Sequence, residues 1–533
     1  MKLSAYSERL DCLLVVPPFW DPLCVPLGPA ALNAYVKEHG YTCDIFDFNT
    51  VPEIFALQNM YFRELERQFP RWKNLSVDRN GTEIFALHQI LYLRARGSCR
   101  YVDMCREILG VGSWSGIEFN FRPERFDFIF ATLFNRVRSL LGELLDARNP
   151  RVLGISLYNS TWPSTCYIAQ IARCLQSDVK IVVGGPGPVM GISSRREDVA
   201  HFLVSTPQID HYVLGEGEDA LLQILREPVL DERIITSGAS ASIVSSEKIL
   251  SLHDLPDPDY GSLDIDSYLH LSISSARGCP YECSFCAETV FWRGFRSIKR
   301  STLLSRVDLL AKRYGRGSFY ICDSLSNQSI GPLTEACLKE GRNYMFDCYL
   351  RADKSCASAN AANRWREGGL KRARLGLESA SQRILNEMVK HTDVEQMQQA
   401  LASLSSAGVR TSTLWIVGYP GETEQEFAES IRFIKENKNS IYQADAWTFQ
   451  YSPAGLAGSA SLDQRGVVPR FSCDLDAILG VQFYSLAGDM TTEERIDRLE
   501  RFVVRMGELG VPNPYSLLQM RVAEQRWSAM GRT

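Results

Sequence analysis

Several features that would identify common protein classes are missing from this sequence. No run of about 18 apolar residues occurs, so no transmembrane helix is predicted. The N-terminal segment has one short apolar run, residues 13–16, and neither the longer stretch nor the small-residue cleavage site of a signal peptide. An excess of positive charge is also missing, since 58 basic and 63 acidic residues give a net charge of −5. This balance argues against sequence-independent binding to nucleic acid.

Length and composition are those of an ordinary globular protein. The 533 residues predict about three to four domains. Hydrophobic residues make up 45% and charged residues 23%, which excludes collagen-like, disordered and coiled-coil classes. The 15 cysteines stand out, because a chain of this length needs no disulfides to stabilise its core. Their odd number fits a reducing cytoplasm, where most of them would be small core residues.

The first half of the chain alternates short apolar strands with helices. Strands are predicted at residues 12–16, 43–46, 152–157, 180–183 and 211–214. Strands separated by helices predict a Rossmann-like, doubly wound parallel sheet in an α/β domain over residues 1–235, with its binding crevice beyond the carboxyl ends of the strands. A segment rich in aromatic residues and arginine, at about 51–145, is interpreted as a helical insertion.

A second alternation follows a proline-rich linker. Residues 226–270 look like a linker with little hairpin content, and the linker proper is assigned to 236–270. Six further strands are predicted at residues 271–275, 318–322, 347–350, 374–377, 412–417 and 446–451. They predict a partial (β/α)6 barrel over 271–455 with its site at the strand carboxyl ends, followed by a helical region over 456–533.

Three cysteines, Cys279, Cys283 and Cys286, directly follow the first strand of the predicted barrel. Thiolates this close together can bind one metal centre. The alternative is a structural zinc site, but such a site takes four ligands, commonly as two C-x2-C pairs, and no fourth Cys or His lies close after Cys286. Three cysteines without a near fourth fit a four-iron cluster with one iron left open.

The C-x3-C-x2-C spacing, with the aromatic Phe285 just before the last cysteine, resembles the radical S-adenosylmethionine (SAM) superfamily. The resemblance implies that Cys279, Cys283 and Cys286 hold a [4Fe–4S] cluster whose open iron binds the amino and carboxylate groups of SAM. An electron from a donor such as flavodoxin or ferredoxin would then cleave SAM to a 5′-deoxyadenosyl radical, shielded from water by the barrel.

Successive strand ends of the predicted barrel carry the other SAM contacts that the resemblance implies. These contacts are Phe285, Asp323, Ser324, Arg351, Glu378, Ser379 and Val417. The alternative for each polar residue is a helix cap or a structural ion pair. Their joint placement at consecutive strand ends favours a cofactor site.

The N-terminal sheet resembles the cobalamin-binding domains fused ahead of the barrel in B12-dependent radical SAM enzymes. The resemblance is carried by strand-end residues, namely Pro17, Pro18, Ser156, Gly184, Gly185, Gly215, Glu216 and Gly217. The alternative is a Rossmann-like sheet with no cofactor or with a nucleotide, although no G-x-G-x-x-G follows the first strand. No Asp-x-His-x-x-Gly motif occurs, so cobalamin is expected base-off, without a protein His ligand, and residues 19–23 are a candidate for the surface beneath the cobalt.

The combined resemblance implies a cobalamin-dependent radical SAM methyltransferase. One SAM would methylate the cobalamin, and a second would give the radical that abstracts hydrogen from an unactivated carbon, which then takes the methyl group from methylcobalamin. We expect a small-molecule or peptide substrate of natural-product biosynthesis, lying between the two sheets, rather than a nucleic acid or a membrane. The alternative within the family is a cyclisation or rearrangement without methyl transfer. The alternative outside it is a non-enzymatic iron–sulfur or zinc protein with a nucleotide-sensing domain.

Overall fold

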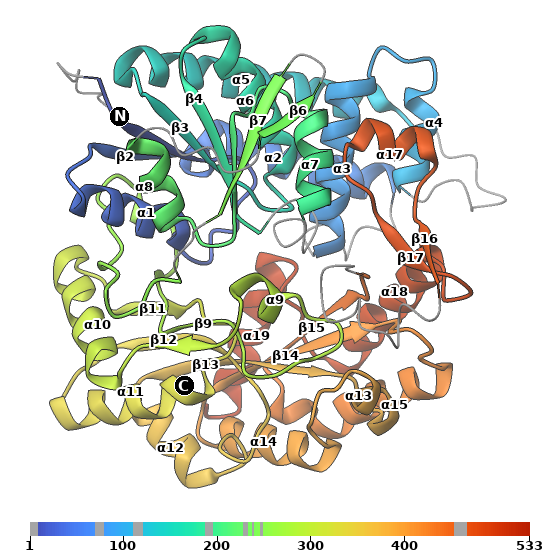
Figure 1. Cartoon of the computed structure of the whole chain (residues 1–533). Helices are drawn as coiled ribbons and strands as arrows, with labels where there is room; N and C mark the ends of the chain where they lie inside the picture. The colour runs from blue at the N-terminus through green and yellow to red at the C-terminus, as the bar shows by residue number, and fades with distance from the viewer. Residues whose placement is uncertain are drawn as a thin grey trace. The chain divides into compact units, whose positions relative to one another are not determined.

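Two parallel sheets, each built from strands that alternate with helices, form the framework of the chain (Figure 1). The computed structural model describes residues 9–69, 79–109, 121–186, 196–226, 233–236, 239–245, 249–451 and 466–532. The chain divides into two units. Unit 1 comprises Met1–Pro70, Gly81–Leu269 and Pro469–Tyr484, and unit 2 comprises Arg71–Asn80, His270–Val468 and Ser485–Thr533.

The sheet of unit 1 has seven strands in the order β2-β1-β3-β4-β5-β7-β6. Every neighbouring pair is parallel except β6 and β7. The strands are β1 Cys12–Val16, β2 Cys43–Asp47, β3 Val152–Ser156, β4 Lys180–Gly184, β5 His211–Leu214, β6 Arg233–Thr236 and β7 Ala239–Ser245. Strand order reverses at β1, which lies between β2 and β3, and such a switch point is where a crevice forms at the carboxyl ends of the strands. This confirms the predicted doubly wound, Rossmann-like sheet.

The helices of unit 1 connect these strands and include the predicted insertion. They are α1 Leu27–Glu38, η1 Phe48–Thr50, α2 Pro52–Gln68, α3 Arg79–Ala95, α4 Tyr101–Leu109, α5 Pro123–Arg148, α6 Trp162–Leu175, α7 Arg196–Ser205, α8 Glu218–Arg226, η5 Ile265–Ser267 and α17 Cys473–Leu479. Helices α2, α3 and α5 pack on one another through an aromatic cluster centred on Tyr61, which contacts the rings of Phe85, Phe126 and Phe130. The insertion therefore has an apolar core of its own.

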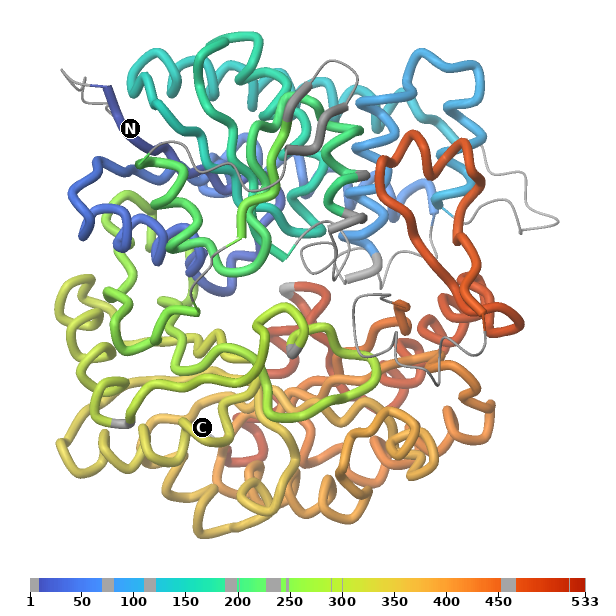
Figure 2. Tube along the Cα trace, in the orientation of Figure 1, coloured from blue at the N-terminus to red at the C-terminus, as the bar shows by residue number. Residues whose placement is uncertain are grey.

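Part of the C-terminal chain belongs to unit 1. Helix α17, in red, lies beside α3 and α4, in blue (Figure 2). The guanidinium of Arg94 on α3 donates to the backbone carbonyls of Ile478 and Leu479, at 3.0 and 3.1 Å. Arg470 forms an ion pair with Glu83 at 2.6 Å. These contacts attach the segment to the insertion.

The sheet of unit 2 has six parallel strands in the order β15-β14-β13-β12-β11-β8. They are β8 Leu271–Ile273, β11 Ser318–Ile321, β12 Met345–Leu350, β13 Leu370–Glu378, β14 Arg410–Val417 and β15 Gln443–Thr448. Neighbours in the sheet are also neighbours in the chain, as in a (β/α) barrel whose ring is incomplete. The predicted partial (β/α)6 barrel is therefore confirmed.

Helices follow the strands of unit 2, and many begin at a side-chain cap. They are α9 Glu288–Trp292, α10 Arg300–Tyr314, α11 Asn327–Glu340, α12 Ala359–Glu367, α13 Gln382–Glu387, α14 Val394–Ser406, α15 Glu424–Asn437, η6 Lys438–Ser440, α18 Thr492–Leu509 and α19 Leu517–Ala529. Thr423 and Thr491 begin α15 and α18 with capping boxes that pair them with Glu426 and Glu494. The structure also has two small two-stranded sheets, antiparallel β9 Ala276–Arg277 with β10 Arg296–Ser297, and β16 Val467–Pro469 with β17 Tyr484–Leu486.

The hairpin β6–β7 is where the structure departs from the prediction of a linker with little hairpin content. Strand β7 pairs in parallel with β5 and so extends the sheet of unit 1. Its sequence, ASASIVS, holds alanine and serine at most positions instead of the β-branched and aromatic residues that signal a strand.

In the part of the chain that the structure describes, no helix is both long and apolar enough to span a bilayer.

Two glycines at the carboxyl edge of unit 1 give a matched test of backbone packing. A Cβ on Gly185 would lie 2.2 Å from the carbonyl oxygen of Leu157, whereas a Cβ on Gly215 would meet nothing within 4 Å. Both have positive φ, +134° and +86°. We expect Gly215→Ala to cost roughly 1–2 kcal/mol of unfolding free energy through backbone strain alone, and Gly185→Ala to cost more than about 3 kcal/mol. Urea titration of the metal-free protein measures both, and equal losses would contradict the packing argument.

Candidate functional site

The three cysteines of the predicted cluster site lie on one irregular loop of unit 2, between β9 and α9. Cys283 is buried, and Cys279 and Cys286 are partly exposed. A tight turn joins the last two, because the amide of Cys286 donates to the carbonyl of Cys283 at 3.0 Å. Among the described residues, no group of three or more His, Cys, Asp or Glu is arranged to hold a metal ion. The cluster therefore stays a prediction, to be judged by the chemistry of the loop.

The surroundings of the thiols fit thiolate ligands. The backbone amides of Tyr281 and Glu288 donate to the sulfurs of Cys279 and Cys286. Burial raises the pKa of Cys279 and raises that of Cys286 to about 12, so both free thiols are protonated at neutral pH. A metal centre that bound them would displace those protons and would find amide donors already directed at the sulfurs.

A buried arginine lies against the same loop. The guanidinium of Arg351, which is 5% exposed, stacks 3.9 Å from the ring centroid of Tyr281. Its Nη1 donates to the sulfur of Cys283 at 3.8 Å, while its Nη2 is buried with no hydrogen-bond partner among the described residues. A buried cation needs a compensating negative charge. A cluster held by three thiolates would supply that charge at the sulfur that Arg351 already contacts.

The predicted SAM contact Asp323 binds residues 274–276, which lead from β8 to the cysteine loop. Its carboxylate is 1% exposed and accepts hydrogen bonds from the amides of Ser275 and Ala276, at 2.7 and 2.9 Å. The hydroxyls of Ser274 and Ser275 also donate to it. Burial raises the pKa of Asp323 to about 6. These contacts fix the segment between β8 and β9 from which the loop leaves the sheet.

Three other predicted contacts lie at the ends of their strands. Ser324 follows β11, and its hydroxyl donates to Glu288 at the start of α9, at 2.6 Å. Ser379 follows β13 and is fully buried, and its oxygen accepts from the amide of Ser381 at 3.1 Å. Val417 ends β14 and is 2% exposed. Each lies where the sequence places it, and Ser324 also contacts the helix that follows the cysteine loop.

Two of the predicted SAM contacts, Phe285 and Glu378, are joined through a lysine that the sequence did not single out. Lys390 forms a buried ion pair with Oε1 of Glu378 at 2.7 Å, and its ammonium lies 5.4 Å from the ring centroid of Phe285. Oε2 of Glu378 is buried and has no hydrogen-bond partner in the described part of the chain. Gly376 leaves room for this pair, because a Cβ there would lie 2.6 Å from Oε1 of Glu378. The arrangement leaves one carboxylate oxygen available beside the cysteine loop.

The middle of the cysteine loop is anchored by a serine and a tyrosine that sequence patterns also missed. The amide of Ser284 donates to the carbonyl of Met388 at 3.0 Å. Its hydroxyl donates to the carbonyl of Glu387 at 3.1 Å and lies 2.9 Å from the hydroxyl of Tyr419. Tyr419 belongs to the loop after β14, so two loops distant in sequence meet between Cys283 and Cys286.

In unit 1, the residues predicted to bind cobalamin all lie at one edge of the sheet. Pro17 and Pro18 follow β1, and Ser156 ends β3. Gly184 and Gly185 end and follow β4, and residues 215–217 lie between β5 and α8. Because these strands are parallel and adjacent, the structure brings all the predicted residues to the carboxyl edge.

Two polar and aromatic neighbours complete this edge. Asn49, after β2, donates to the carbonyl of Pro17 at 3.1 Å and accepts from the amide of Trp20 at 2.8 Å. The ring of Trp20 meets that of Tyr158, after β3, at 4.8 Å between centroids. The predicted 19–23 segment is thereby fixed between the ends of β2 and β3. Asn49 and Tyr158 carry no motif that would have identified them in the sequence.

The pair Glu378–Lys390 gives a prediction of buried-charge energetics. Lys390→Met leaves Glu378 buried with neither oxygen paired, which should cost about 3–5 kcal/mol of unfolding free energy. The double variant Glu378→Gln/Lys390→Met removes both charges and should recover much of that loss. Arg364→Met is the matched control, because it breaks an exposed pair with Glu335 and should cost less than about 1 kcal/mol. Urea titration of the metal-free protein decides, and equal losses in the single and double variants would contradict the pairing.

Comparison with known proteins shows which families and folds these features resemble. Residues 273–434 match the model of the Radical SAM superfamily. The anaerobic magnesium-protoporphyrin IX monomethyl ester cyclase of Rubrivivax gelatinosus is 26% identical over 289 residues, which are 50% of this chain and 51% of the cyclase. An uncharacterized methyltransferase of Pyrococcus horikoshii is 24% identical over 316 residues, which are 56% of this chain and 66% of that protein. The chain thus spans between one half and two thirds of the length of these relatives.

Two solved structures share the fold along almost the whole chain. The radical SAM methyltransferase TsrM from Kitasatospora setae, with cobalamin and a [4Fe–4S] cluster bound, has a TM-score of 0.60 at 13% identity and covers 98% of this chain and 100% of its own. The cobalamin-dependent SAM radical enzyme OxsB, with aqua-cobalamin and SAM bound, has a TM-score of 0.53 at 16% identity and covers 98% and 66%. The chain therefore contains a region, residues 273–434, that matches the Radical SAM superfamily, and it shares the fold of TsrM and OxsB.

Proposed function

We propose that this protein is a cobalamin-dependent radical SAM methyltransferase that methylates an unactivated carbon of a small molecule or peptide. The observation that carries the proposal is the joining, in one chain, of a three-cysteine loop after the first barrel strand to a second parallel sheet with a glycine-rich carboxyl edge. With a [4Fe–4S] cluster, SAM and cobalamin bound, the chemistry supplied would be a carbon-centred radical and a transferable methyl group.

In this proposal, the cysteine loop and Arg351 hold the cluster. Cys279, Cys283 and Cys286 are its ligands, and the amides directed at their sulfurs stabilise the anionic form. Arg351 compensates the added negative charge from the side of Cys283. An external electron donor, such as flavodoxin or ferredoxin, would supply the electron.

SAM would bind at the strand ends around the same loop. The ring of Phe285 offers an apolar face for the adenine, and Val417 at the end of β14 offers a second. The free Oε2 of Glu378 can accept a hydrogen bond from a ribose hydroxyl or an amino group, while Lys390 holds the other oxygen in place. Asp323 and Ser324 keep the loop and α9 in the position that this site requires.

Cobalamin would bind at the carboxyl edge of unit 1, base-off. The glycines Gly184, Gly185, Gly215 and Gly217 place no side chain at this edge, and the pair Trp20–Tyr158 contributes aromatic rings there. Two histidines of unit 1 already engage other groups. His88 is buried against Tyr61 and Cys105, and His211 lies 2.6 Å from the hydroxyl of Ser242. These contacts argue against either of these two histidines as a ligand beneath the cobalt.

A second candidate function is a cyclisation or rearrangement that uses the same cofactors without methyl transfer. The observation that favours it is the 26% identity to the magnesium-protoporphyrin monomethyl ester cyclase. Both candidates need the same cluster loop and the same sheet edge, so these sites do not separate them.

The cofactor sites can be tested independently by absorption spectroscopy. We expect the anaerobically purified and reconstituted protein to show both iron–sulfur and corrinoid bands. The triple variant Cys279→Ala/Cys283→Ala/Cys286→Ala should lose the iron–sulfur bands completely and keep the corrinoid bands, because the thiols lie in unit 2 and the corrinoid edge lies in unit 1. The matched control Cys99→Ala/Cys174→Ala/Cys473→Ala removes three exposed cysteines and should keep both sets of bands. Iron–sulfur bands that survive in the first variant would contradict the ligand assignment.

The product mass distinguishes the two functions. The candidate substrates are the peptides or small molecules of the biosynthetic pathway that the neighbouring genes indicate. Each is incubated anaerobically with the holoenzyme, SAM and a reductant. A product heavier by one methylene, together with deoxyadenosine, is the expected result. Deoxyadenosine formed with an unmethylated product would overturn the methyltransferase proposal in favour of the cyclase-like function.

A further inference from the structure

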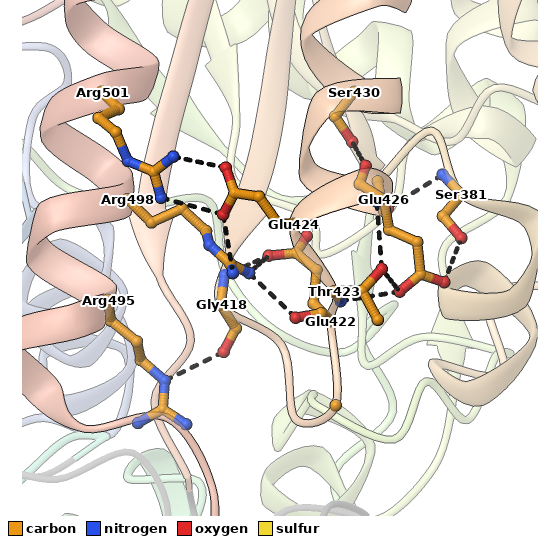
Figure 3. Close-up of polar contacts among 12 residues, drawn as sticks. Ser381, Gly418, Glu422, Thr423, Glu424, Glu426, Ser430, Arg495, Arg498 and Arg501 are labelled. Atoms are coloured by element: carbon orange, nitrogen blue, oxygen red, sulfur yellow. Dashed lines mark hydrogen bonds and ion pairs between the residues drawn. The ribbon is translucent and has the colours of Figure 1, made fainter.

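Three arginines on one face of α18 contact the segment that follows β14 (Figure 3). Arg495, Arg498 and Arg501 are spaced three residues apart, so their side chains project from the same side of the helix. Their partners are Gly418, Glu422 and Glu424. Helix α18 lies in the C-terminal region, whereas the contacted segment, residues 418–424, directly follows Val417, one of the predicted SAM contacts.

Arg495 packs closely on the first residue of this segment. Its Nε donates to the carbonyl of Gly418 at 3.0 Å. Gly418 has a φ of +73°, and a Cβ there would lie 2.7 Å from Cγ of Arg495. The glycine is therefore required both by its backbone conformation and by the close approach of α18. Arg495 is itself fixed by an ion pair with Asp489.

Arg498 closes a hydrogen-bonded ring around the same segment. Its Nη1 donates to the carboxylate of Glu422 at 2.8 Å and to the backbone carbonyl of Glu422 at 3.1 Å. The carboxylate also accepts from the amide of Gly418 at 2.9 Å. The side chains of Arg498 and Glu422 are 9% and 2% exposed. A buried pair of this kind adds little net stability but fixes one geometry, because either charge left alone would be costly.

The ring is linked to the cysteine loop through Tyr419. Tyr419 lies inside the segment that the ring closes and is 1% exposed. Its hydroxyl lies 2.9 Å from the hydroxyl of Ser284 and donates to the carbonyl of Glu387 at 3.2 Å. Ser284 stands between Cys283 and Cys286. A continuous chain of contacts therefore runs from α18 through residues 418–422 to the middle of the cysteine loop.

We propose that α18 is a positioning element for the cysteine loop, with Arg498, Glu422, Tyr419 and Ser284 as its positioning residues. We call this chain of contacts, from Arg498 through Glu422 and Tyr419 to Ser284, the relay. It is expected to act in the metal-free protein as well as in the holoenzyme. Its effect on cofactors rests on the proposed function. Loss of the buried ion pair frees the segment, Tyr419 loses its fixed position, and the loop between Cys283 and Cys286 samples more conformations.

Hydrogen exchange of the metal-free protein tests the relay without any cofactor. Arg498→Met should speed exchange about tenfold in peptides covering both residues 415–424 and residues 278–290, as expected for loss of one charged hydrogen-bonded contact. Tyr419→Phe should speed exchange in residues 278–290 only, by about fivefold, because it removes one hydroxyl and leaves the ring intact. Arg501→Gln is the control and should change neither peptide, since it loses exposed pairs with Glu424 and Asp497 and a cation–π contact with Phe427 but leaves the contacts of Arg498 with Glu422 intact.

A spectroscopic readout extends the test to the cofactor site. After anaerobic reconstitution, Arg498→Met and Tyr419→Phe should retain iron, while the electron paramagnetic resonance signal of the reduced cluster broadens and its shift on adding SAM diminishes. Arg501→Gln should give the wild-type spectrum with and without SAM. Ser284→Thr keeps a hydroxyl and should preserve more of the SAM-induced shift than Ser284→Ala.

The outcomes separate the relay from the proposed function. If the wild-type protein binds no iron–sulfur cluster, the proposed function fails, and hydrogen exchange alone decides the relay. If Arg498→Met changes exchange only in residues 415–424, or if Tyr419→Phe leaves the cysteine loop unchanged, the relay is overturned while the proposed function stands. Should Arg498→Met fail to fold, Tyr419→Phe still decides, because a wild-type exchange pattern there overturns the proposal.

Discussion

The cysteine loop lies outside helices and strands, so its position depends on contacts with the rest of unit 2. A loop outside regular structure pays its conformational entropy residue by residue, so external contacts must fix it. Asp323 fixes the approach through two backbone amides, and Ser284 fixes the middle through Met388 and Glu387. Arg351 fixes the buried thiol of Cys283. The ends of several parallel strands thus define the position of three sulfurs.

Buried ion pairs fix the side chains at these strand ends. In unit 2, Asp347 and Arg374 form a two-pronged pair at 2.8 Å across β12 and β13, and Glu378 and Arg498 take part in other buried pairs. Replacing such pairs by apolar residues is often neutral or stabilising, so their contribution is a defined geometry. Arg351 differs from them, because in the described residues it faces a sulfur and no carboxylate. Its location marks the place where additional negative charge is expected.

The sequence predicted the elements whose signal is local. Apolar strand runs identified both sheets, and the spacing of Cys279, Cys283 and Cys286 singled out the cysteine loop, whose cluster stays a prediction. Contacts between distant segments had no such signal: Lys390 lies over a hundred residues beyond Phe285, and Arg498 lies 76 residues beyond Glu422. Strand β13 begins at Leu370, four residues before the predicted strand 374–377, and the partner of its Arg374, Asp347 on β12, has no signal in the sequence. Pairing across strands therefore had to be seen in three dimensions.

The glycines of unit 1 show how a motif can have a structural cause. Gly185 is required because any Cβ would strike the carbonyl of Leu157, and a Cβ on Gly184 would lie 3.1 Å from that of Val213. A Cβ on Gly217 would lie 3.1 Å from the side chain of Leu32, and glycine is favoured at position 215 because φ there is +86°. The backbone of this sheet edge thus demands each glycine whether or not a ligand binds. The glycines therefore report on the fold, which the chain shares with TsrM and OxsB, and do not by themselves argue for a ligand.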